Sequence, residues 1–569
     1  MTAAGIEASL LSLLAVFILA AGVGVFVAKV GRFPYTIALL LAGLAVSILG
    51  VEIGLELSHD MILLVLLPPL LFEGAATTDL ARFRANIVPI LVLAVPGLII
   101  SVLILGFAGQ FAFGFPLLIA LLFAATILPT DPVSVLALFE ELGAPRRLSI
   151  LVEGESLLND GVGVVVFSAL LAIIVETGTD PAALFTPEKL ATVGVDIAIA
   201  SLGGLVVGLA AGYAVFRVMA NLDEHMTEIV LTLILAYGSF LLAEHYLHVS
   251  GVIATVSAGL FIGNRGAEYA MSPQTKIAVF NTWETAAFLV NTLIFLLIGA
   301  KTPVTQLVTH LPLIAVAIVL VVVVRALTVY PLLSLTNLRL DVTVPRSYQH
   351  VAVWGGLHAS IPIALVLGLP PSIPFREELR AMVFGVAAFS LVVQGLSMER
   401  LLDALDIVTR SDEEELYELL VGRARAVDNA LEAAEELRRT GAIPPDVYEQ
   451  FTTEYEAEKD DLNRAISSLL TSHPQIHREE LLIGERQVLK REKSAIMDAM
   501  RTGTLSDDVG EKLLEEVDLK LSRVNAGEST VTASPDVDGY EEFWRAKAAE
   551  FGLDVDAPTE NETDREPNG

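Results

Sequence analysis

The residues of this chain that could do chemistry are a few polar side chains set in long apolar segments. The sequence from Leu151 reads LVEGESLLNDGVGVVVFSALLAII, in which Glu155 and Asn159 are four residues apart, as are Ser156 and Asp160. On a helix, these two pairs share adjoining faces. Their carboxylate, amide and hydroxyl oxygens suit a small hard cation, and a lone carboxylate also suits a proton. We expect an ion site there rather than a polar helix cap.

A second polar group lies upstream, in LLFAATILPTDPVSVLALF, where Pro129 and Pro132 bracket Thr130 and Asp131. Two prolines three residues apart remove two backbone donors, so the helix is expected to break between them. A break at membrane depth is tolerated only where the freed backbone lines a cavity or an ion site. A simple proline kink would leave the Asp between the prolines unexplained.

Two further residues stand out in apolar surroundings. Arg325 lies in the middle of IAVAIVLVVVVRALTVYPLL, too far from either end to reach water, so it needs a buried partner, and Glu155 is the natural candidate. In VAVWGGLHASIPIALVLG, a glycine pair and Pro362 interrupt the segment beside His358. A lone His on an apolar helix is usually a core residue, but the neighbouring glycines favour a role at this second break.

Membrane-spanning helices must position these residues. The chain has 569 residues, 54% of them hydrophobic, and a net charge of −31. The first 395 residues hold 25 acidic and 16 basic residues, and the remainder hold 42 and 20. A span needs about 20 mostly apolar residues. This rule predicts thirteen spans, near residues 8–29, 36–51, 60–77, 87–109, 115–139, 150–175, 190–219, 226–246, 249–263, 278–300, 311–336, 348–369 and 382–402.

The loops indicate how the chain is oriented. With the N-terminus outside, the inner loops hold eleven Lys and Arg residues and the outer loops hold four, as expected for a cell-membrane protein. An odd number of spans then places the acidic tail in the cytoplasm. We divide the chain into a transmembrane domain (1–405), a helical cytoplasmic domain (406–525) and an acidic, largely disordered tail (526–569). No ligand is predicted for the tail.

Composition excludes several classes of function. An acidic chain without a basic cluster is a poor nucleic-acid binder. The absence of cysteine excludes disulfides, thiol catalysis and thiolate metal sites, and no motif for a cofactor is present. Two interrupted spans, the fifth and the twelfth, are typical of a transporter built from inverted repeats. Such a protein is not an enzyme.

Around these residues the sequence resembles the monovalent cation:proton antiporters of the NhaP and eukaryotic sodium/proton exchanger type. The matching strings are LLFEGA, TDPVSV, EGESLLNDG, HVSGVIATVSAGLFIGN, WETAAFLVNTLIFLLIG and WGGLHASIPIAL, in the order of the family. The resemblance implies an all-α polytopic membrane protein that forms a homodimer in lipid. It also implies about thirteen helices in inverted repeats, with two crossed interrupted helices. These motifs do not extend into the tail.

The resemblance also implies roles for individual residues. Asp160 would bind Na⁺ and H⁺ in competition, with Thr130, Ser156 and Glu155 completing the cation shell. Asn159 would orient the site, and the Asn at this position, where electrogenic relatives have a second Asp, implies electroneutral one-for-one exchange. The Na⁺ site would then consist chiefly of Asp160, Ser156 and Thr130.

The remaining charged residues would have structural roles. Glu155 would form an ion pair with Arg325, and Asp131 would compensate the dipole ends of the crossed half-helices. His358 stands where the family usually has Arg, in the pattern GGLRGA. A His carries a positive charge only when protonated, and its reference pKa is about 6.5. His358 therefore either alters the pH dependence or shows that this position tolerates a neutral residue.

We therefore expect a secondary sodium/proton antiporter that works by alternating access and serves sodium and pH homeostasis. Potassium/proton exchange is the alternative, because oxygen ligands alone do not fix the size of the ion, and Li⁺ is also a candidate substrate. An intramembrane aspartyl protease would use Asp131 and Asp160, but its GxGD element is absent and Arg325 has no role in it. No repeated pore loop indicates a channel.

Overall fold

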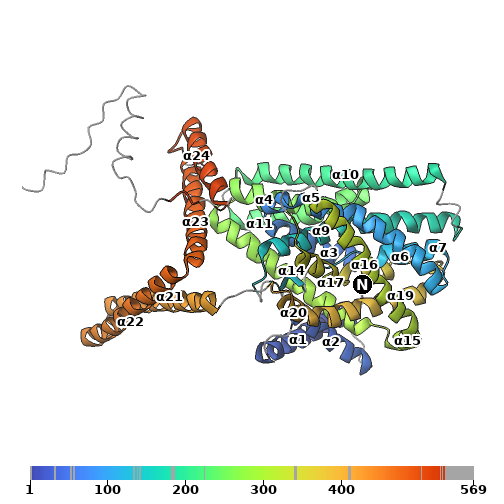
Figure 1. Ribbon diagram of the computed structural model, residues 1–569, viewed down its shortest axis with the longest axis horizontal. Helices are drawn as coiled ribbons and strands as arrows, with labels where there is room; N and C mark the ends of the chain where they lie inside the picture. Colours follow the sequence, from blue (N-terminus) through green and yellow to red (C-terminus); the bar gives the residue numbers. More distant parts are fainter. Residues whose placement is uncertain are drawn as a thin grey trace, which may run out of the picture. The chain divides into compact units, whose positions relative to one another are not determined.

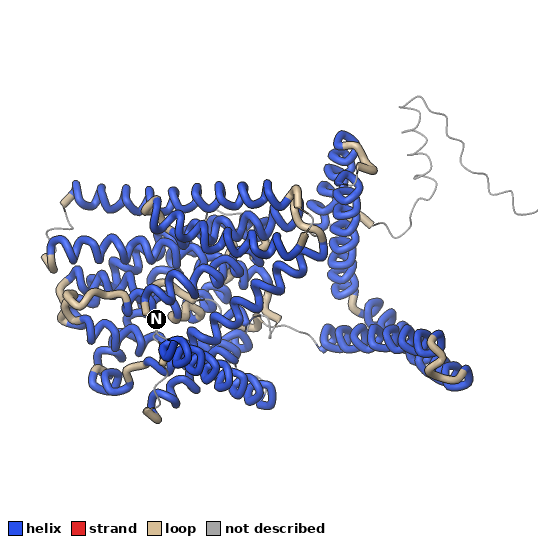
Figure 2. Tube along the Cα trace, turned by 180° about the vertical axis from the view of Figure 1, so that it is seen from behind, coloured by secondary structure: helices blue, strands red, loops and turns tan. Residues whose placement is uncertain are grey.

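The structure is a computed structural model, and its described residues form helices joined by turns and loops (Figure 2). It describes residues 3–30, 34–50, 54–55, 58–131, 135–137, 139, 143–180, 186–222, 224–338, 343–407, 412–501, 503–525, 527 and 529–531. The chain divides into two compact units, Met1–Thr409 and Arg410–Gly569.

The first unit is a bundle of α-helices (Figure 1). Its helices are α1 (Ala3–Val30), α2 (Tyr35–Ile48), α3 (Leu67–Thr77), α4 (Leu80–Ala85), α5 (Ile87–Val92), α6 (Leu98–Phe113), α7 (Leu117–Ile127), α9 (Arg146–Thr177), α10 (Pro187–Met219), α11 (His225–Leu241), α12 (Gly251–Phe261), α13 (Ala267–Tyr269), α14 (Pro273–Lys301), α15 (Val304–Thr309), α16 (Leu311–Asn337), α17 (Arg346–Trp354), α18 (Ser360–Leu367), α19 (Arg376–Phe389) and α20 (Gly395–Ala404). Short π-helical turns adjoin several of them: η1 (Met61–Leu66), η2 (Leu93–Gly97), η4 (Leu242–Tyr246), η5 (Ile262–Gly266) and η6 (Ser390–Gln394).

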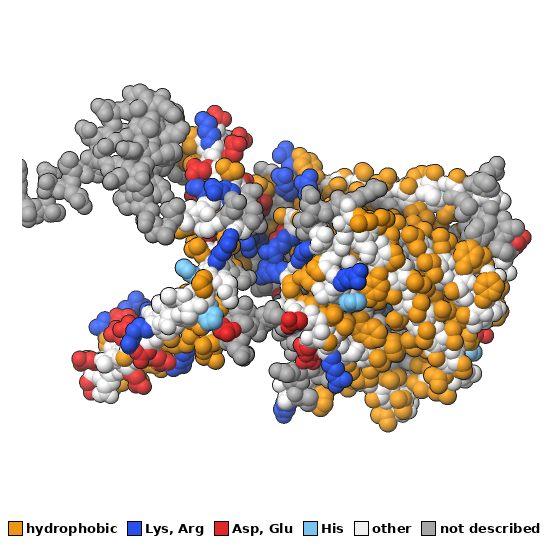
Figure 3. All heavy atoms as spheres, in the orientation of Figure 1, with side chains coloured by type: hydrophobic (Ala, Val, Ile, Leu, Met, Phe, Trp, Pro, Cys, Tyr) orange, Lys and Arg blue, Asp and Glu red, His pale blue; other side chains and the backbone are white. Residues whose placement is uncertain are grey.

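The surface of this bundle suits a lipid environment. Within the described residues, eight helices are long and apolar enough to cross a membrane, and three shorter apolar helices accompany them. Large apolar side chains lie on the outside, among them Ile18 of α1 and Leu202 and Val206 of α10, each more than half exposed. In Figure 3, hydrophobic side chains cover much of the visible face of this bundle. An apolar exterior of this extent identifies a multi-pass membrane protein.

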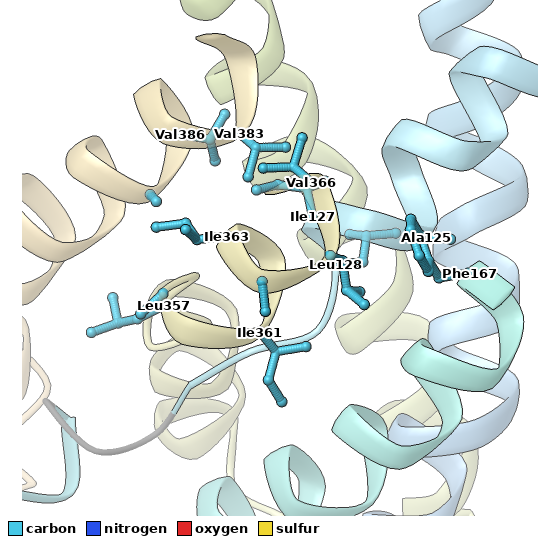
Figure 4. Packing of buried hydrophobic residues seen from close by; sticks show 14 of the residues in the cluster. Ala125, Ile127, Leu128, Phe167, Leu357, Ile361, Ile363, Val366, Val383 and Val386 are labelled. Carbon is cyan, nitrogen blue, oxygen red and sulfur yellow. The ribbon is translucent and has the colours of Figure 1, made fainter. Parts of the chain in front are cut away.

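The helices that carry the polar residues lie inside the bundle. Every residue of α7 is buried, and so is the part of α9 from Gly154 to Val164 apart from Leu158. Figure 4 shows Ile127 and Leu128, at the end of α7, beside the helix that carries Ile361 and Val366. The ends of two short helices therefore meet in the apolar core, away from the lipid-facing surface.

Glycines allow the closest helix packing in the unit. A Cβ atom built on Gly43 of α2 would lie 2.1 Å from the carbonyl oxygen of Leu296, and one built on Gly299 of α14 would lie 2.2 Å from that of Leu40. Backbones approach this closely only where side chains are absent, as is common between membrane helices. The contact between α2 and α14 therefore depends on both glycines.

The described residues of the second unit form four helices, α21 (Asp412–Arg439), α22 (Pro445–Ser472), α23 (Pro474–Arg501) and α24 (Asp507–Asn525). Arg423 and Glu458 form an ion pair between α21 and α22 at 2.6 Å, and Leu489 and Val517 pack between α23 and α24. The predicted acidic tail, 526–569, falls almost entirely outside the described residues.

Replacement of Gly299 by Ala is expected to destabilise the first unit. The added methyl group would overlap a backbone carbonyl that cannot rotate away, and overpacking of this kind typically costs about 1–3 kcal/mol. The thermal unfolding temperature of the purified protein in detergent should fall. Gly22→Ala in α1 is the matched control, because nothing lies within 4 Å of its Cβ position. Equal unfolding temperatures for the two variants would contradict this view of the α2–α14 contact.

Candidate functional site

The first break follows the end of α7 at Ile127 and contains the non-helical residues 128–131. Side chains of α9 hold it at Thr130. Asn159 accepts a hydrogen bond from the Thr130 amide at 3.3 Å through Oδ1 and donates one to the Thr130 hydroxyl at 2.9 Å through Nδ2. The Ser156 hydroxyl donates to the Thr130 carbonyl. α9 approaches this closely because Gly163 faces Pro129, whose Cγ would lie 2.4 Å from a Cβ at that position.

The second break lies between the end of α17 at Trp354 and the start of α18 at Ser360. It contacts the first break directly. The Asp131 amide donates to the Leu357 carbonyl at 2.7 Å, and the Ser360 hydroxyl donates to Asp131 Oδ2 at 3.0 Å. His358 Nδ1 lies 3.1 Å from the carbonyl oxygen of Pro129. A carbonyl oxygen only accepts, so Nδ1 carries the proton in this contact.

Asp160 follows Asn159 on α9 and is buried, with 7% of its surface exposed. Among the described residues, no donor reaches its Oδ1 atom. Its charge lies close enough to that of Asp131 for the two to interact. A buried carboxylate oxygen without a donor is costly, and a cation or a proton would remove that cost. The arrangement can therefore bind an exchangeable positive charge.

Glu155 and Arg325 form a bidentate ion pair. The two guanidinium nitrogens of Arg325 donate to the two carboxylate oxygens of Glu155 at 2.5 and 2.8 Å. Arg325 also donates to the carbonyl of Ala352 in α17, at 3.0 and 3.2 Å. It passes directly beside Gly356, where a Cβ atom would lie 2.9 Å from its Nε. Arg325 therefore connects α9 and α16 with the second break.

The structure brings most of the residues selected from the sequence into two adjoining groups. One group is held together by hydrogen bonds. Ser156 and Asn159 from α9 bond to Thr130, and Asp131 and His358 bond to the backbone of the opposite break. The pair of Glu155 and Arg325 lies beside them. Asp160 is the next residue of α9 after Asn159, and within the described part of the chain no hydrogen bond is donated to its Oδ1 atom from this cluster.

Sequence reasoning gave no role to a group of three acidic residues, of which Glu73 and Glu153 are half-buried and Glu284 is exposed. Glu73 of α3 lies close enough to Glu153 and Glu284 for their charges to interact, and Glu153 accepts a hydrogen bond from the Thr78 hydroxyl at 2.8 Å. Glu73 belongs to LLFEGA, a string that carries the family resemblance but implies no role for its carboxylate. The rule that selected Asp160, a carboxylate inside an apolar segment, would also have selected Glu73.

Comparison with known proteins gives consistent matches. The family model described as "Sodium/hydrogen exchanger, transmembrane" matches residues 13–404. The Na⁺/H⁺ antiporter ApNhaP of Aphanothece halophytica is 34% identical over 495 residues, which is 85% of this chain and 91% of that protein. The Na⁺/H⁺ antiporter NhaG of Bacillus atrophaeus is 34% identical over 519 residues, 88% of this chain and 96% of that protein. Both alignments cover more than the first unit, so the similarity continues into the second, beyond the motifs noted in the sequence.

A solved structure has a similar fold. The sodium proton antiporter MjNhaP1 from Methanocaldococcus jannaschii superimposes with a TM-score of 0.58 and covers 71% of this chain and 99% of its own. The two sequences are 20% identical, so this likeness concerns the fold alone.

Loss of one partner of the buried ion pair is expected to destabilise the protein strongly. Arg325→Met leaves Glu155 buried and uncompensated, which typically costs about 3–5 kcal/mol. The double variant Glu155→Leu, Arg325→Met leaves no charge and should recover part of that loss. Denaturant unfolding of the detergent-solubilised protein measures both. A single variant as stable as the wild type, or a double variant that recovers nothing, would contradict the assignment.

Proposed function

The chain belongs to the sodium/hydrogen exchanger family, and from that premise we propose that it is a secondary antiporter that exchanges Na⁺ for H⁺ across the cell membrane. Relatives that match most of the chain are named Na⁺/H⁺ antiporters. The observation that carries the proposal is the buried Oδ1 atom of Asp160, which no donor reaches among the described residues. No catalytic chemistry is required, because the function is transport.

The Na⁺ ion, as substrate, binds to Asp160 with the oxygens of Ser156 and Thr130. These oxygens suit a small hard cation. The Ser156 hydroxyl donates a hydrogen bond to the Thr130 carbonyl, so the lone pairs of the hydroxyl oxygen remain available to an ion. Asn159 orients Thr130 through two hydrogen bonds. We assign Glu155 to the ion pair rather than to the cation shell, because Arg325 engages both of its oxygens.

Competition at Asp160 couples the two fluxes. If the carboxylate carries either a proton or a Na⁺ ion, and the site changes its access only when it is occupied, each inward ion is exchanged for one outward ion. Asn159 is neutral, and Glu155 is held in an ion pair, so one carboxylate gives one positive charge in each direction. The exchange is therefore electroneutral and should slow at both acid and alkaline pH.

The ends of the broken helices are compensated by residues of the opposite break. Asp131 accepts a hydrogen bond from Ser360, the first residue of α18, and a carboxylate is favourable at a helix N-terminus. His358 donates to Pro129, just beyond the end of α7, where a donor satisfies a free carbonyl. The Nδ1 proton that makes this bond is present in both the neutral and the protonated ring, so His358 can donate it without the permanent charge of an Arg.

We further propose the setting in which the exchange occurs. The protein works as a homodimer in lipid, with its N-terminus outside and the second unit in the cytoplasm. The excess of Lys and Arg in the inner loops supports this orientation. Li⁺ and K⁺ are the other ions to compare with Na⁺ as substrates.

Asp160→Asn is expected to abolish Na⁺-driven proton flux in proteoliposomes and to leave the fold intact, because Asn binds neither ion as a charge. Asp196→Asn is the matched control: this Asp lies exposed on α10, so its replacement should leave the flux unchanged. Flux should be measured with Na⁺, Li⁺ and K⁺. Transport by Asp160→Asn near the wild-type rate would show that Asp160 does not bind the exchanged ions. If the wild type prefers K⁺, the substrate is K⁺ and not Na⁺.

The rate of exchange is expected to be independent of membrane potential, because no net charge moves. Proteoliposomes with potassium and valinomycin can be clamped at different voltages while Na⁺-dependent proton flux is followed. A rate that changes steeply with voltage would show unequal charge transfer and overturn the one-for-one stoichiometry.

A further inference from the structure

Three polar side chains line one face of the last helix of the first unit, which runs from α19 through η6 into α20. Ser390, Gln394 and Ser397 follow one another at spacings of four and three residues, which places them on the same face. Ser390 is fully buried and Gln394 is 3% exposed. Buried polar groups at membrane depth need partners. Ser390 and Ser397 bond in part to carbonyl groups of their own helix, and the other partners of these three lie in the second break and at the end of α17.

The partners are chiefly backbone groups that the break frees from helical hydrogen bonding. Gln394 Nε2 donates to the carbonyl of Trp354, the last residue of α17, at 3.1 Å. The Ser390 hydroxyl accepts a hydrogen bond from the His358 amide at 3.1 Å and lies 3.2 Å from the His358 carbonyl oxygen. The Trp354 indole donates to Ser397 at 2.8 Å. The last helix therefore holds both sides of the break.

The turn that carries these side chains is itself irregular. The amide of Gly395 bonds to the carbonyl of Ser390, five residues earlier, so η6 is a single π-helical turn. Such turns are rare and are often found at functional sites. Here the turn bears both residues that bond to the backbone of the break, Ser390 at its start and Gln394 at its end.

The break is connected to the ion site through two short contacts. His358, whose amide is bonded to Ser390, donates from its ring to the Pro129 carbonyl. The neighbouring Leu357 carbonyl accepts the hydrogen bond from the Asp131 amide. Pro129 and Asp131 flank Thr130, so a shift of the second break also shifts Thr130.

We propose that Ser390 and Gln394 are positioning residues for cation exchange. They hold the second break in the geometry that keeps Thr130 in place for the ion bound at Asp160, and they do so without contacting the ion. This inference rests on the proposed function of the site. It adds the last helix of the first unit to the parts of the chain that set Na⁺ affinity.

The test uses Ser390→Ala, which removes the hydroxyl, and Gln394→Met, which keeps the length of the side chain but removes the donor. Val393→Ala is the matched control, because Val393 belongs to the same turn and its side chain is 45% exposed. For each full-length protein, hydrogen–deuterium exchange of the peptide spanning residues 354–360 reports on the break. Na⁺-dependent proton flux in proteoliposomes gives KM and kcat.

Both variants should exchange amide hydrogens in this peptide faster, by about tenfold, because a hydrogen bond at the break is lost. The KM for Na⁺ should rise about three- to tenfold with kcat nearly unchanged, since the ligands are displaced but the coupling carboxylate is intact. Val393→Ala should change neither quantity. Since the two variants remove different hydrogen bonds, either one that folds decides the question.

If the rate of hydrogen–deuterium exchange is unchanged in both variants, the two residues have no role at the break. Faster hydrogen–deuterium exchange with an unchanged KM for Na⁺ would show that the two residues are only structural, which would also overturn the proposal. A wild-type protein without Na⁺-dependent flux would refute the proposed function and the positioning role together. The exchange measurement distinguishes these failures, because it does not depend on transport.

Discussion

Two interrupted helices satisfy each other's backbone groups in the core of the bundle, and the candidate site depends on this contact. The Asp131 amide donates to the Leu357 carbonyl at 2.7 Å, and His358 donates to the carbonyl of Pro129. Inside a bilayer, water cannot replace these partners. The breaks can therefore exist only where they cross, and their crossing fixes the position of Thr130 between the two contacts.

The charges around the crossing are unequal in a way that suits exchange. Glu155 and Arg325 neutralise each other through two hydrogen bonds, and Asp131 accepts one from Ser360. The Oδ1 atom of Asp160, by contrast, has no donor among the described residues. The ion pair keeps a fixed net charge of zero, while a carboxylate with one oxygen that lacks a donor can accept different cations in turn. The proposed one-for-one exchange requires this division of roles.

Much of this arrangement follows from the sequence, because the energetic costs of a proline inside a helix and of an unpaired charge in the membrane can be recognised from short segments. Prolines around Thr130 and the glycine pair before His358 predict the two breaks, and the cost of an isolated charge predicts a partner for Arg325. The contacts themselves depend on tertiary packing. Spacing alone does not reveal that the Asn159 amide bonds twice to Thr130, or that Ser390 bonds to the backbone of His358. Such polar residues on the last helix look ordinary until their partners are known.

Competition between Na⁺ and H⁺ for Asp160 is tested most directly by proton release. Na⁺ is added to the detergent-solubilised protein in weakly buffered solution near neutral pH, and the change in pH is measured. The wild type should release up to about one proton per chain, because one carboxylate exchanges its proton for the cation. Asp160→Asn should release none. Na⁺ binding without proton release by the wild type, or equal release by Asp160→Asn, would contradict competition at this residue.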